Sequence, residues 1–444
     1  MKSKFKITPA QILAIGFLLL ILVGTALLSL PFASNDGQVR FIDALFTATS
    51  ATCVTGLVTL NTATQWTLFG KIVIIVMIQI GGLGFMTFIS LTGIIAKKRF
   101  SLHERKIMMQ STGSLELSGL TKLVRRIAIG TFIVEGIGAL ILAIKLWTSN
   151  YSFAKGLWYG IFHSVSAFCN AGFDIFGTSS LEAFNGDYVV LITLALLVII
   201  GGIGFIVWED IASNGFHFKK YKLHSKLVLL TTFVLLAGGT VIFFFTEKNH
   251  AFSELSTGEK WLNAFFQSTT LRTAGFASVN QASLSNSGFV SSVVLMLIGG
   301  SPGSTAGGIK TITVTVLVLN ALCFSKNQSS LVTFKKRIHD DLVKQASAIA
   351  SIYLTLAVTV TCIICAIESN AQIPLRSIAF EVASAVATVG LTEGITPLLS
   401  VASKALLCFT MYFGRLGGLT LLLAIAEKKT GCTLEKPCEK ILIG

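Results

Sequence analysis

Four short stretches of the chain combine residue types and a spacing that could bind a desolvated cation. Each starts with Phe, has Gly ten residues later followed by Leu or Phe, and carries Ser or Thr six residues before the glycine. Glycine lacks a Cβ and adopts positive φ readily, so the carbonyls beside it can face one way and replace the hydration shell of a cation. The stretches are FTATSATCVTGL (46–57), FHSVSAFCNAGF (162–173), FFQSTTLRTAGF (265–276) and FEVASAVATVGL (380–391).

The backbone around each glycine supplies the candidate ion ligands. A single stretch of this kind is more often a turn closed by glycine, with the Ser or Thr capping a helix. Four in one register favour an ion path, because the glycines lie 116, 103 and 115 residues apart and indicate a fourfold internal repeat. The predicted filter residues are Val54, Thr55, Gly56, Asn170, Ala171, Gly172, Thr273, Ala274, Gly275, Thr388, Val389 and Gly390. The repeated hydroxyl residues are Ser50, Ser166, Thr269 and Ser384.

Membrane helices are the elements that must position these stretches. The chain is 53% hydrophobic and only 13% charged over 444 residues, and runs of about 20 apolar residues recur along it. The first run follows a basic N-terminus, but it is longer than the core of a signal peptide, so a retained span is expected. The eight cysteines mostly lie in apolar runs, which argues against disulfides or a metal site. Full spans are predicted at 9–30, 67–96, 122–147, 187–211, 225–246, 288–322, 343–367 and 400–427.

The placement of basic residues predicts the orientation. Of the 35 Lys and Arg residues, 24 lie in the N-terminus, in three connecting segments and in the C-terminal tail. This side should be cytoplasmic, so both termini are expected there in a multi-pass protein of the cell membrane. The net charge of +14 therefore reflects topology, and nucleic-acid binding is not expected. The basic connecting segments are 97–126, 212–226 and 323–344.

Each external connection between paired spans contains one of the four glycine stretches. At about 12 residues these segments are too short to cross the bilayer, and they suit re-entrant helices that surround one axis. The predicted fold is an all-α polytopic membrane protein with eight full spans and four re-entrant pore helices around one central pore. The expected repeats are 1–96, 97–211, 212–322 with a broken sixth span, and 323–444 with a cytoplasmic tail.

A second glycine-rich site begins 24 to 29 residues after each filter glycine. GGLGF (81–85), GGIGF (201–205) and GRLGG (414–418) are each compatible with a continuous helix, whose small residues allow close packing. GGSPGSTAGGIK (299–310) is not, because its glycines and proline cannot propagate a helix, so the sixth span should break there. The predicted gate beneath the filter consists of Ser301, Pro302, Gly303, Ser304, Thr305, Ala306, Gly307 and Arg415.

Several charged residues lie inside or beside the predicted spans. Arg415 is expected at the level of the broken segment, where a fixed positive charge would repel a cation, although an arginine that ties helices together is the alternative. Lys310 carries the same ambiguity, and Arg272 is expected to brace the filter from behind. An interfacial position is expected for Glu135, Lys145, Glu209 and Asp210.

Motifs of soluble enzymes are matched only in part. Gly299 to Gly303 satisfies G-x-S-x-G, but the site lies within an apolar helix and has no strand before it. Gly303 to Lys310 is similar to a phosphate loop, except that Ile309 interrupts the required ending. A membrane-embedded enzyme is therefore the weak alternative, and no nucleotide site is expected in this chain.

Taken together, the four repeats, the single filter glycines, the GGSPGSTAGGIK break and the arginine of GRLGG resemble the Ktr/Trk/HKT superfamily of K⁺ transporters. The similarity covers essentially the whole chain and is greatest to the KtrB-type membrane subunit of bacterial Ktr systems. It implies K⁺ uptake with K⁺ bound at the filter carbonyls, and it leaves Na⁺ dependence open. It also implies a homodimer with one pore in each protomer, bound to a cytoplasmic ring of nucleotide-binding KtrA-type subunits. In that family the broken segment is a gating loop and the arginine helps to close the pore; these roles fall here on 301–307 and Arg415.

The filter sequences also set an expectation for selectivity. CVTG, CNAG, RTAG and ATVG differ from one another and lack the TVGYG of tetrameric K⁺ channels, so moderate selectivity for K⁺ over Na⁺ is expected. A stoichiometric Na⁺/K⁺ symporter on the same fold would share every motif, so that alternative stays open.

Overall fold

The computed structural model describes residues 8–84, 87–88, 90–91, 104–105, 109, 119–149, 151–177, 180–215, 217–328 and 330–417. The basic N-terminus, most of the basic segment 97–126 and the tail after Glu427 lie outside the described residues. The same is true of most of 85–96 and all of 418–427, the distal parts of two predicted spans.

Long apolar helices form the frame of the molecule. Within the described part of the chain, four helices are long and apolar enough to cross a bilayer: α1 (Pro9–Leu28), α7 (Leu120–Thr148), α11 (Leu223–Glu247) and α15 (Asp340–Ile367). A fifth is reached if α9 (Tyr188–Gly202) and α10 (Phe205–Asn214), bent by 93° at the break between them, count as one. Shorter apolar helices are α4 (Leu68–Leu83), α13 (Asn286–Leu297) and α14 (Thr311–Ser325), and α17 (Val401–Leu416) ends the described chain.

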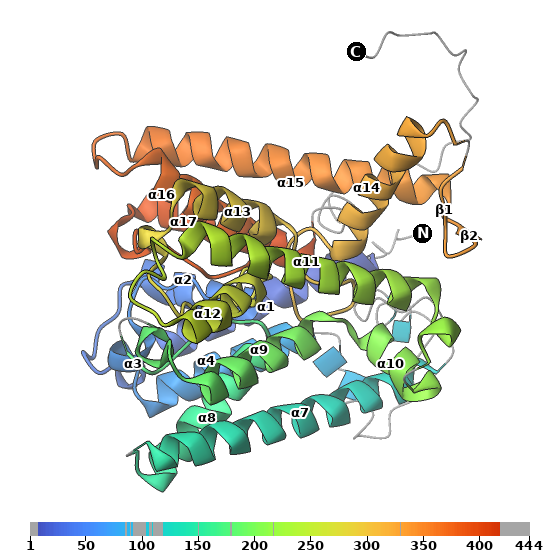
Figure 1. Cartoon of the computed structure of the whole chain (residues 1–444). Helices are drawn as coiled ribbons and strands as arrows, with labels where there is room; N and C mark the ends of the chain where they lie inside the picture. Colours follow the sequence, from blue (N-terminus) through green and yellow to red (C-terminus); the bar gives the residue numbers. More distant parts are fainter. Residues whose placement is uncertain are drawn as a thin grey trace, which may run out of the picture.

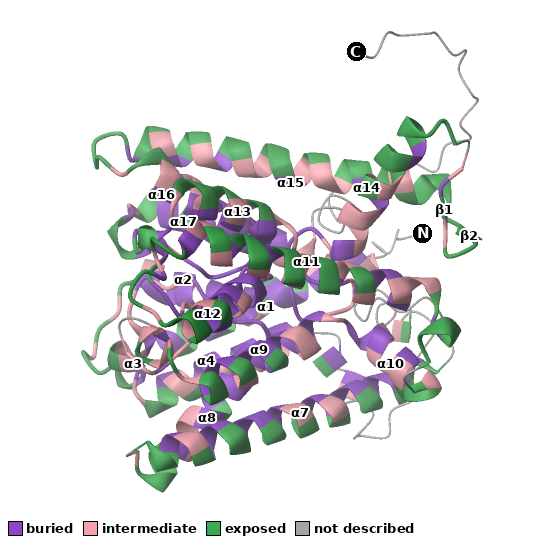
Figure 2. Ribbon diagram, viewed as in Figure 1, coloured by how far each residue is buried: buried purple, intermediate pink, exposed green. Residues whose placement is uncertain are grey.

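The outer faces of these helices are apolar as well as exposed. Phe132 on α7, Phe233 on α11 and Val358 on α15 are among the large hydrophobic side chains that are more than half exposed. Figure 2 shows the exposed residues along the outer helices and the buried ones gathered between them. An apolar outer surface of this kind suits lipid tails.

Polar side chains fix where many of the helices begin. Ser285 caps α13 and Ser400 caps α17, each through a side-chain bond to a backbone N–H of the first turn. A carboxylate from the end of the preceding long helix holds each cap, since Ser285 Oγ donates to Glu247 at 2.5 Å and the backbone N–H of Ser400 donates to Glu368 at 2.9 Å. These contacts place the second helix of a pair relative to the first at the same end of the bundle.

Four short helices lie between the long ones, in the same half of the bundle, toward the left of Figure 1. They are α2 (Phe41–Cys53), α8 (Phe153–Phe168), α12 (Thr257–Thr270) and α16 (Leu375–Ala387), and each contains the start of one glycine stretch. Each packs on the long helix before it, α1, α7, α11 or α15. Each is also contacted by the helix that follows the previous short helix, in the order α4 with α8, α9 with α12, α13 with α16 and α17 with α2. The last contact joins the end of the described chain to its beginning, so the four short helices form a closed ring.

The expectation of three continuous glycine-rich helices is wrong. The helix stops at all four sites: α4 ends at Leu83, α9 at Gly202, α13 at Leu297 and α17 at Leu416. The glycines that follow the three simple breaks have φ of 85° at Gly84, 101° at Gly204 and 82° at Gly417. A right-handed helix cannot continue through such a residue, which explains why α4, α9 and α17 end at these sites.

The all-helical prediction also needs one small correction. Strands β1 (Val332–Thr333) and β2 (Lys336–Arg337) form an antiparallel hairpin in the connection between α14 and α15. Its turn residues, Phe334 and Lys335, both have positive φ, as a two-residue hairpin turn requires. Short connecting helices are α3 (Thr62–Gln65), η1 (Pro31–Ala33), η2 (Glu182–Phe184), η3 (Phe218–Lys220), η4 (Gln281–Ser283) and η5 (Thr396–Leu398).

Candidate ion-binding ring and the loop beneath it

Each of the four short helices ends at a backbone that alternates in handedness. In all four stretches, the repeated glycine and the residue two positions before it have positive φ. Such an alternation lets successive carbonyls face the same side of the chain. The pairs are Val54 and Gly56, Asn170 and Gly172, Thr273 and Gly275, and Thr388 and Gly390.

The four glycines meet face to face. A Cβ built on Gly56 would lie 2.6 Å from the carbonyl oxygen of Ala171, and one on Gly172 would lie 2.8 Å from that of Ala274. A Cβ on Gly275 would lie 2.5 Å from the oxygen of Val389, and one on Gly390 would overlap the oxygen of Thr55. Each glycine therefore faces the carbonyl that precedes the next glycine, and the fourth returns to the first. In each predicted filter triplet, the glycine and the residue before it therefore contact the neighbouring stretch, and the first residue of the triplet has positive φ.

Hydroxyl groups at the ends of the short helices hold the ring segments. The amide N–H of Gly56 donates to Ser50 Oγ, and that of Gly390 donates to Ser384 Oγ, both at 3.0 Å. Ser166 Oγ instead donates to the carbonyl of Phe173 at 2.7 Å. These bonds fix the loop after each helix to the helix that carries it.

The third repeat departs from the sequence alignment at this contact. Thr269 was aligned with the other hydroxyl residues, but its Oγ1 donates to Phe265 within α12. Thr270, one residue later, donates to the carbonyl of Phe276 at 2.7 Å and takes the structural role. Spacing alone could not distinguish two adjacent threonines.

Three hydroxyls near the ring have no hydrogen-bond partner among the described residues. They belong to Thr52, Thr55 and Thr388, whose side chains are buried. A buried hydroxyl without a partner is costly, and a bound cation or its water is a chemically suitable partner. The ring thus has side-chain oxygens as well as carbonyls to offer.

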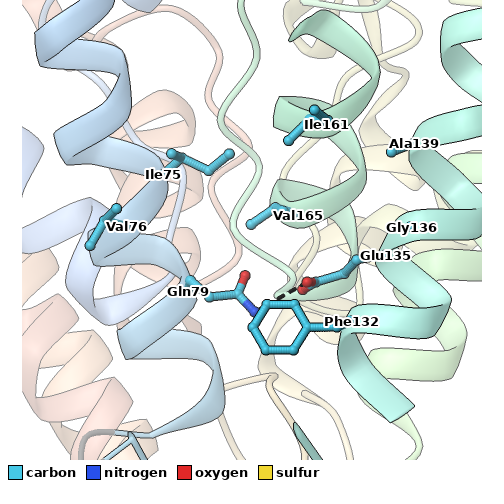
Figure 3. A pocket seen from close by; sticks show the side chains of 9 residues that line it. All are labelled: Ile75, Val76, Gln79, Phe132, Glu135, Gly136, Ala139, Ile161 and Val165. Carbon is cyan, nitrogen blue, oxygen red and sulfur yellow. Dashed lines mark hydrogen bonds between the residues drawn. The ribbon is translucent and has the colours of Figure 1, made fainter. Parts of the chain in front are cut away.

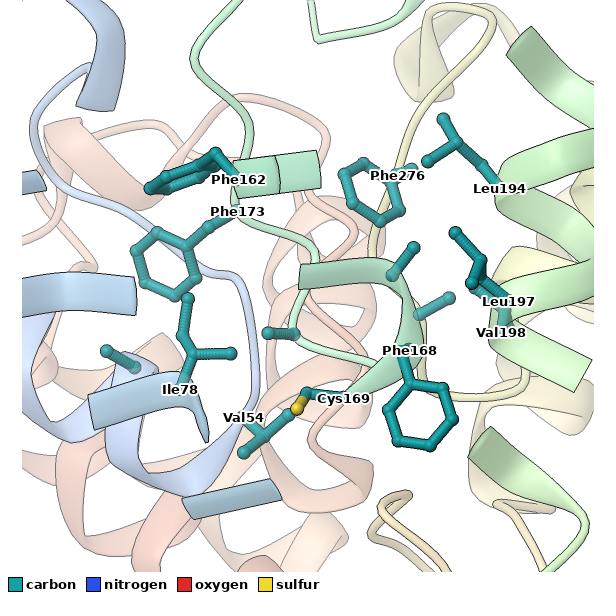
Figure 4. Close-up of a cluster of buried hydrophobic side chains, with 14 of the residues drawn as sticks. Val54, Ile78, Phe162, Phe168, Cys169, Phe173, Leu194, Leu197, Val198 and Phe276 are labelled. Atoms are coloured by element: carbon teal, nitrogen blue, oxygen red, sulfur yellow. The ribbon is translucent and has the colours of Figure 1, made fainter. Parts of the chain in front are cut away.

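Tight apolar packing supports the ring from outside. Val54 and Cys169 lie in one continuous buried cluster with Phe168, Phe173 and Phe276, as Figure 4 shows. All five side chains are at most 1% exposed. Close-packed interiors of this kind resist displacement, which keeps the carbonyls in place.

An open cavity of about 140 Å³ lies over the ring on the side of the connecting loops. All four glycines line it, together with Asn61, Asp174 and Thr392. Asp174 lies in the connection between α8 and α9, where desolvation raises the pKa of its carboxyl to about 6, against the bonds that it accepts from Ser180 and two backbone amides. No sequence motif indicated this carboxylate at the mouth of the ring.

Arg272 lies behind the ring, as expected. Its side chain is 6% exposed, and its guanidinium is 3.5 Å from Thr232 Oγ1 on α11. Its backbone carbonyl accepts a hydrogen bond from Asn170 Nδ2 at 3.4 Å. The side chain therefore points toward α11 while the backbone takes part in contacts between repeats.

The segment between α13 and α14 passes directly beneath the ring. Thr305 Oγ1 lies 3.1 Å from the carbonyl of Phe168 and 3.2 Å from Asn170 Oδ1, at the end of the second repeat's filter stretch. A Cβ on Gly307 would overlap Thr388 Oγ1, which belongs to the fourth repeat's stretch. The loop thus touches two opposite filter stretches, and Ser301, Thr305 and Ala306 are buried there.

Arg415 joins this loop to the first repeat. Its guanidinium donates to the carbonyl of Thr305 and to the carbonyls of Gly81 and Gly82, the last at 3.1 Å. Lys310 instead donates to Ala306 within the loop, at 2.6 Å. The predicted gate residues are therefore in one place, with Arg415 as the cross-link and Lys310 as a support of the loop itself.

Comparison with known proteins decides the family. Residues 7–431 match the family described as TrkH, cation transport protein. The chain belongs to this family. It is an integral membrane protein of the TrkH cation transport family.

Full-length relatives agree with that assignment. The chain is 41% identical to the potassium/sodium uptake protein NtpJ of Enterococcus hirae, over 99% of this chain and 98% of that one. It is 38% identical to the Ktr system potassium uptake protein B of Bacillus subtilis, over 95% and 94% of the two chains. The crystal structure of the potassium transporter TrkH from Vibrio parahaemolyticus has the same fold, with a TM-score of 0.72, 19% identity, and coverage of 96% and 87%.

One charged residue of this TrkH-family chain does not lie at the interfacial position that was expected for it. Glu135 was assigned to an interface, but it lies at the middle of α7 and is 5% exposed. Gln79 Nε2 on α4 donates to its carboxylate at 3.2 Å, which makes burial tolerable.

Lys145 pairs with Asp187 at 3.0 Å near the end of α7, and Glu209 lies 3.7 Å from Arg126. Asp210 accepts a hydrogen bond from the backbone of Lys222 after the bend at α10.

Proposed function

We propose that this chain takes up K⁺ through a gated pore whose selectivity filter is the ring of four glycine stretches. The carrying observation is the ring itself, since the carbonyls of Thr55, Ala171, Ala274 and Val389 lie against the four glycines. Carbonyl oxygens around one axis can replace the water shell of K⁺. The family and the names of the relatives, which are K⁺ or K⁺/Na⁺ uptake proteins, support the same ion.

The proposed architecture is four repeats of span, pore helix and span, with eight spans in all and both termini in the cytoplasm. The repeats would be 1–96, 97–211, 212–322 and 323–444. The cyclic order of contacts among the short helices supports this division, because each repeat touches the next and the fourth touches the first. The twelve filter residues then face one shared axis.

We propose that residues 301–307 and Arg415 form the gate. A loop held below the ring obstructs the path, and the guanidinium adds a fixed positive charge that a cation must pass. The contacts of Arg415 with Thr305 and Gly82 support this role, because they tie the loop in position. Opening would require these bonds to break.

A stoichiometric Na⁺/K⁺ symporter is the second candidate. The relative from Enterococcus hirae, which matches nearly the whole chain, is named for both ions. The reversal potential in liposomes with opposed Na⁺ and K⁺ gradients separates the two. A value set by K⁺ alone supports the channel-like pathway, whereas a value that moves with the Na⁺ gradient supports symport.

We propose a homodimer with a cytoplasmic ring of nucleotide-binding subunits as the working assembly. The relatives named as parts of a Ktr system support a partner. Regulation by nucleotide would then require that partner. Nucleotide-sensitive K⁺ flux from the purified chain alone would contradict this.

The test is K⁺ flux into proteoliposomes that contain the purified chain, with or without its cytoplasmic partner. Gly275→Asp adds a side chain against the carbonyl of Val389 and should abolish selective flux, whereas Gly37→Asp is the matched control. Gly37 also has positive φ, at 70°, but nothing lies within 4 Å of its Cβ position. Arg415→Ala should raise flux. Flux that is unchanged in Gly275→Asp would overturn the proposed filter.

A further inference from the structure

A lateral cavity of about 340 Å³ lies between α4, α7 and α8, away from the ring. Figure 3 shows its lining, with Glu135 and Gln79 pointing toward each other. The volume is within the range of about 300–1,000 Å³ typical of small-molecule sites. The apolar lining residues are Ile75, Val76, Phe132, Ala139, Ile161 and Val165.

The cavity opens toward the apolar outer surface. Phe132, Ile161 and Val76 are 59%, 38% and 48% exposed, so the side chains at its mouth belong to the lipid-facing side of the molecule. A molecule dissolved in the bilayer therefore has direct access. Gly136 adds open space, because no atom lies within 4 Å of its Cβ position.

One carboxylate lies in this apolar cavity without a cation beside it. Glu135 accepts a hydrogen bond from Gln79 Nε2 at 3.2 Å and a weak one from Cys169 Sγ at 3.9 Å. Among the described residues, no Lys or Arg lies within salt-bridge distance of it. A carboxylate at this depth in a membrane protein is expected to have a functional partner.

We propose that this cavity binds an amphipathic amine. The ammonium would lie against the carboxylate of Glu135 and the Oε1 atom of Gln79, and the apolar tail would fill the space lined by α4, α7 and α8. An ammonium has several donors and no acceptor, and the two polar side chains present acceptor oxygens. Charge complementarity inside an apolar pocket makes this class of ligand fit better than a neutral lipid.

Binding here would reach the ring through Cys169. Its thiol donates to Gln79 Oε1 at 3.7 Å and to Glu135, the same acceptors that the ammonium would take. Cys169 directly precedes Asn170, a filter residue that also contacts the loop through Thr305. The amine should therefore lower K⁺ flux. This effect on flux rests on the proposed function, whereas binding of the amine to the cavity does not depend on it.

The test measures equilibrium binding of radiolabelled phenylbutylamine to the purified full-length chain in detergent, with phenylbutanol as the neutral competitor. One saturable site is expected in the wild type, and phenylbutanol should not compete. Glu135→Gln should weaken binding by about tenfold or more, as expected for the loss of a largely buried charge pair.

Gly136→Leu fills the cavity and should abolish binding. Gly238→Leu on α11 is its matched control, because Gly238 is also an exposed helical glycine with nothing within 4 Å of its Cβ position. Wild-type affinity in Gly238→Leu with none in Gly136→Leu places the amine in this cavity. Wild-type affinity in both Glu135→Gln and Gly136→Leu, or full competition by phenylbutanol, would overturn the proposal.

Measurements of K⁺ flux with and without the amine separate the proposed amine site from the proposed K⁺ uptake. Phenylbutylamine should lower K⁺ flux several-fold in the wild type and in Gly238→Leu but not in Gly136→Leu. Binding without any K⁺ flux in any sample would contradict the proposed function and leave the amine site standing. K⁺ flux without any amine binding would contradict the amine site and leave the proposed function standing.

Discussion

The ring of glycine stretches and the level beneath it differ in symmetry. At the ring, all four repeats have the same backbone alternation, and each glycine faces the carbonyl that precedes the next. Beneath it, three repeats have a simple break in the helix, but the third inserts the loop between α13 and α14, and the fourth has Arg415. In GGLG, GGIG and GRLG, this arginine occupies the position of Gly82 and Gly202.

This difference separates two tasks. A cation on an axis is best held by equivalent oxygens on every side, so all four repeats keep the same backbone. Closing a path requires only an obstacle, and an obstacle from one side can also be withdrawn. The four repeats are thus alike at the proposed ion site and unlike at the proposed gate.

The symmetry of the ring is broken most severely by Gly390→Ala. The added methyl group overlaps the carbonyl of Thr55, and φ of 98° adds strain of roughly 1–3 kcal/mol. K⁺ flux in proteoliposomes should fall by about 100-fold, the effect of nearly 3 kcal/mol on the barrier. Gly37→Ala carries similar strain without the overlap and should keep wild-type flux. A Gly390→Ala protein that folds and transports normally would show that the ring is not the ion path.

The asymmetry beneath the ring is reduced by Arg415→Gly, which makes the fourth repeat resemble the first two. This removes the bonds to Thr305 and Gly82 together with the positive charge. Flux should rise by about tenfold, corresponding to about 1.4 kcal/mol. Arg415→Lys keeps the charge, so its K⁺ flux should lie between that of the wild type and that of Arg415→Gly. Lower flux in Arg415→Gly with a normally folded protein would mean that the arginine supports the pore and does not close it.

Thr305→Val tests the loop's contact with the ring at nearly constant volume. It removes the hydroxyl proton that the carbonyl of Phe168 and Asn170 Oδ1 share as acceptors, a loss of about 1 kcal/mol, so flux should rise by about fivefold. Ser304→Ala is the control, because Ser304 Oγ donates to Ser301 within the loop. Equal effects of the two variants would show that general loosening of the loop explains the change.

The smallest effect is expected at the outer mouth. The pKa of Asp174 is raised from 3.8 to about 6, so its carboxylate is charged above that pH and neutral below it. Flux at low K⁺ should therefore fall by about twofold as the external pH drops through 6, since a negative charge at the mouth concentrates cations. Asp174→Asn should show the lower flux at every pH. A pH dependence that persists in this variant would assign the titration to another group.

The shared backbone of the four glycine stretches was predictable because its determinants are local. A repeated glycine at fixed spacing after a short helix specifies the same backbone four times, so the residues proposed as the filter could be listed from the sequence. The role of Thr270 could not, because it lies next to Thr269 and the choice depends on how α12 ends.

The breaks beneath the ring were harder to predict. Glycine is tolerated inside membrane helices, so composition alone did not show that Gly84, Gly204 and Gly417 adopt positive φ. Aligning the three motifs would have shown a glycine at the same place in each. Glu135 was assigned to an interface on the general cost of burying charge, whereas its partner Gln79 comes from another helix and depends on tertiary packing.

The most direct test of the ring is crystallography of the protein soaked with Rb⁺ or Tl⁺, read as anomalous difference density. The account predicts a peak on the axis of the ring, among the carbonyl oxygens of Thr55, Ala171, Ala274 and Val389. The peak should vanish in Gly390→Ala and persist in Arg415→Gly. Density that is absent from the ring in the wild type, or that occupies only a site elsewhere in the bundle, would contradict the central claim.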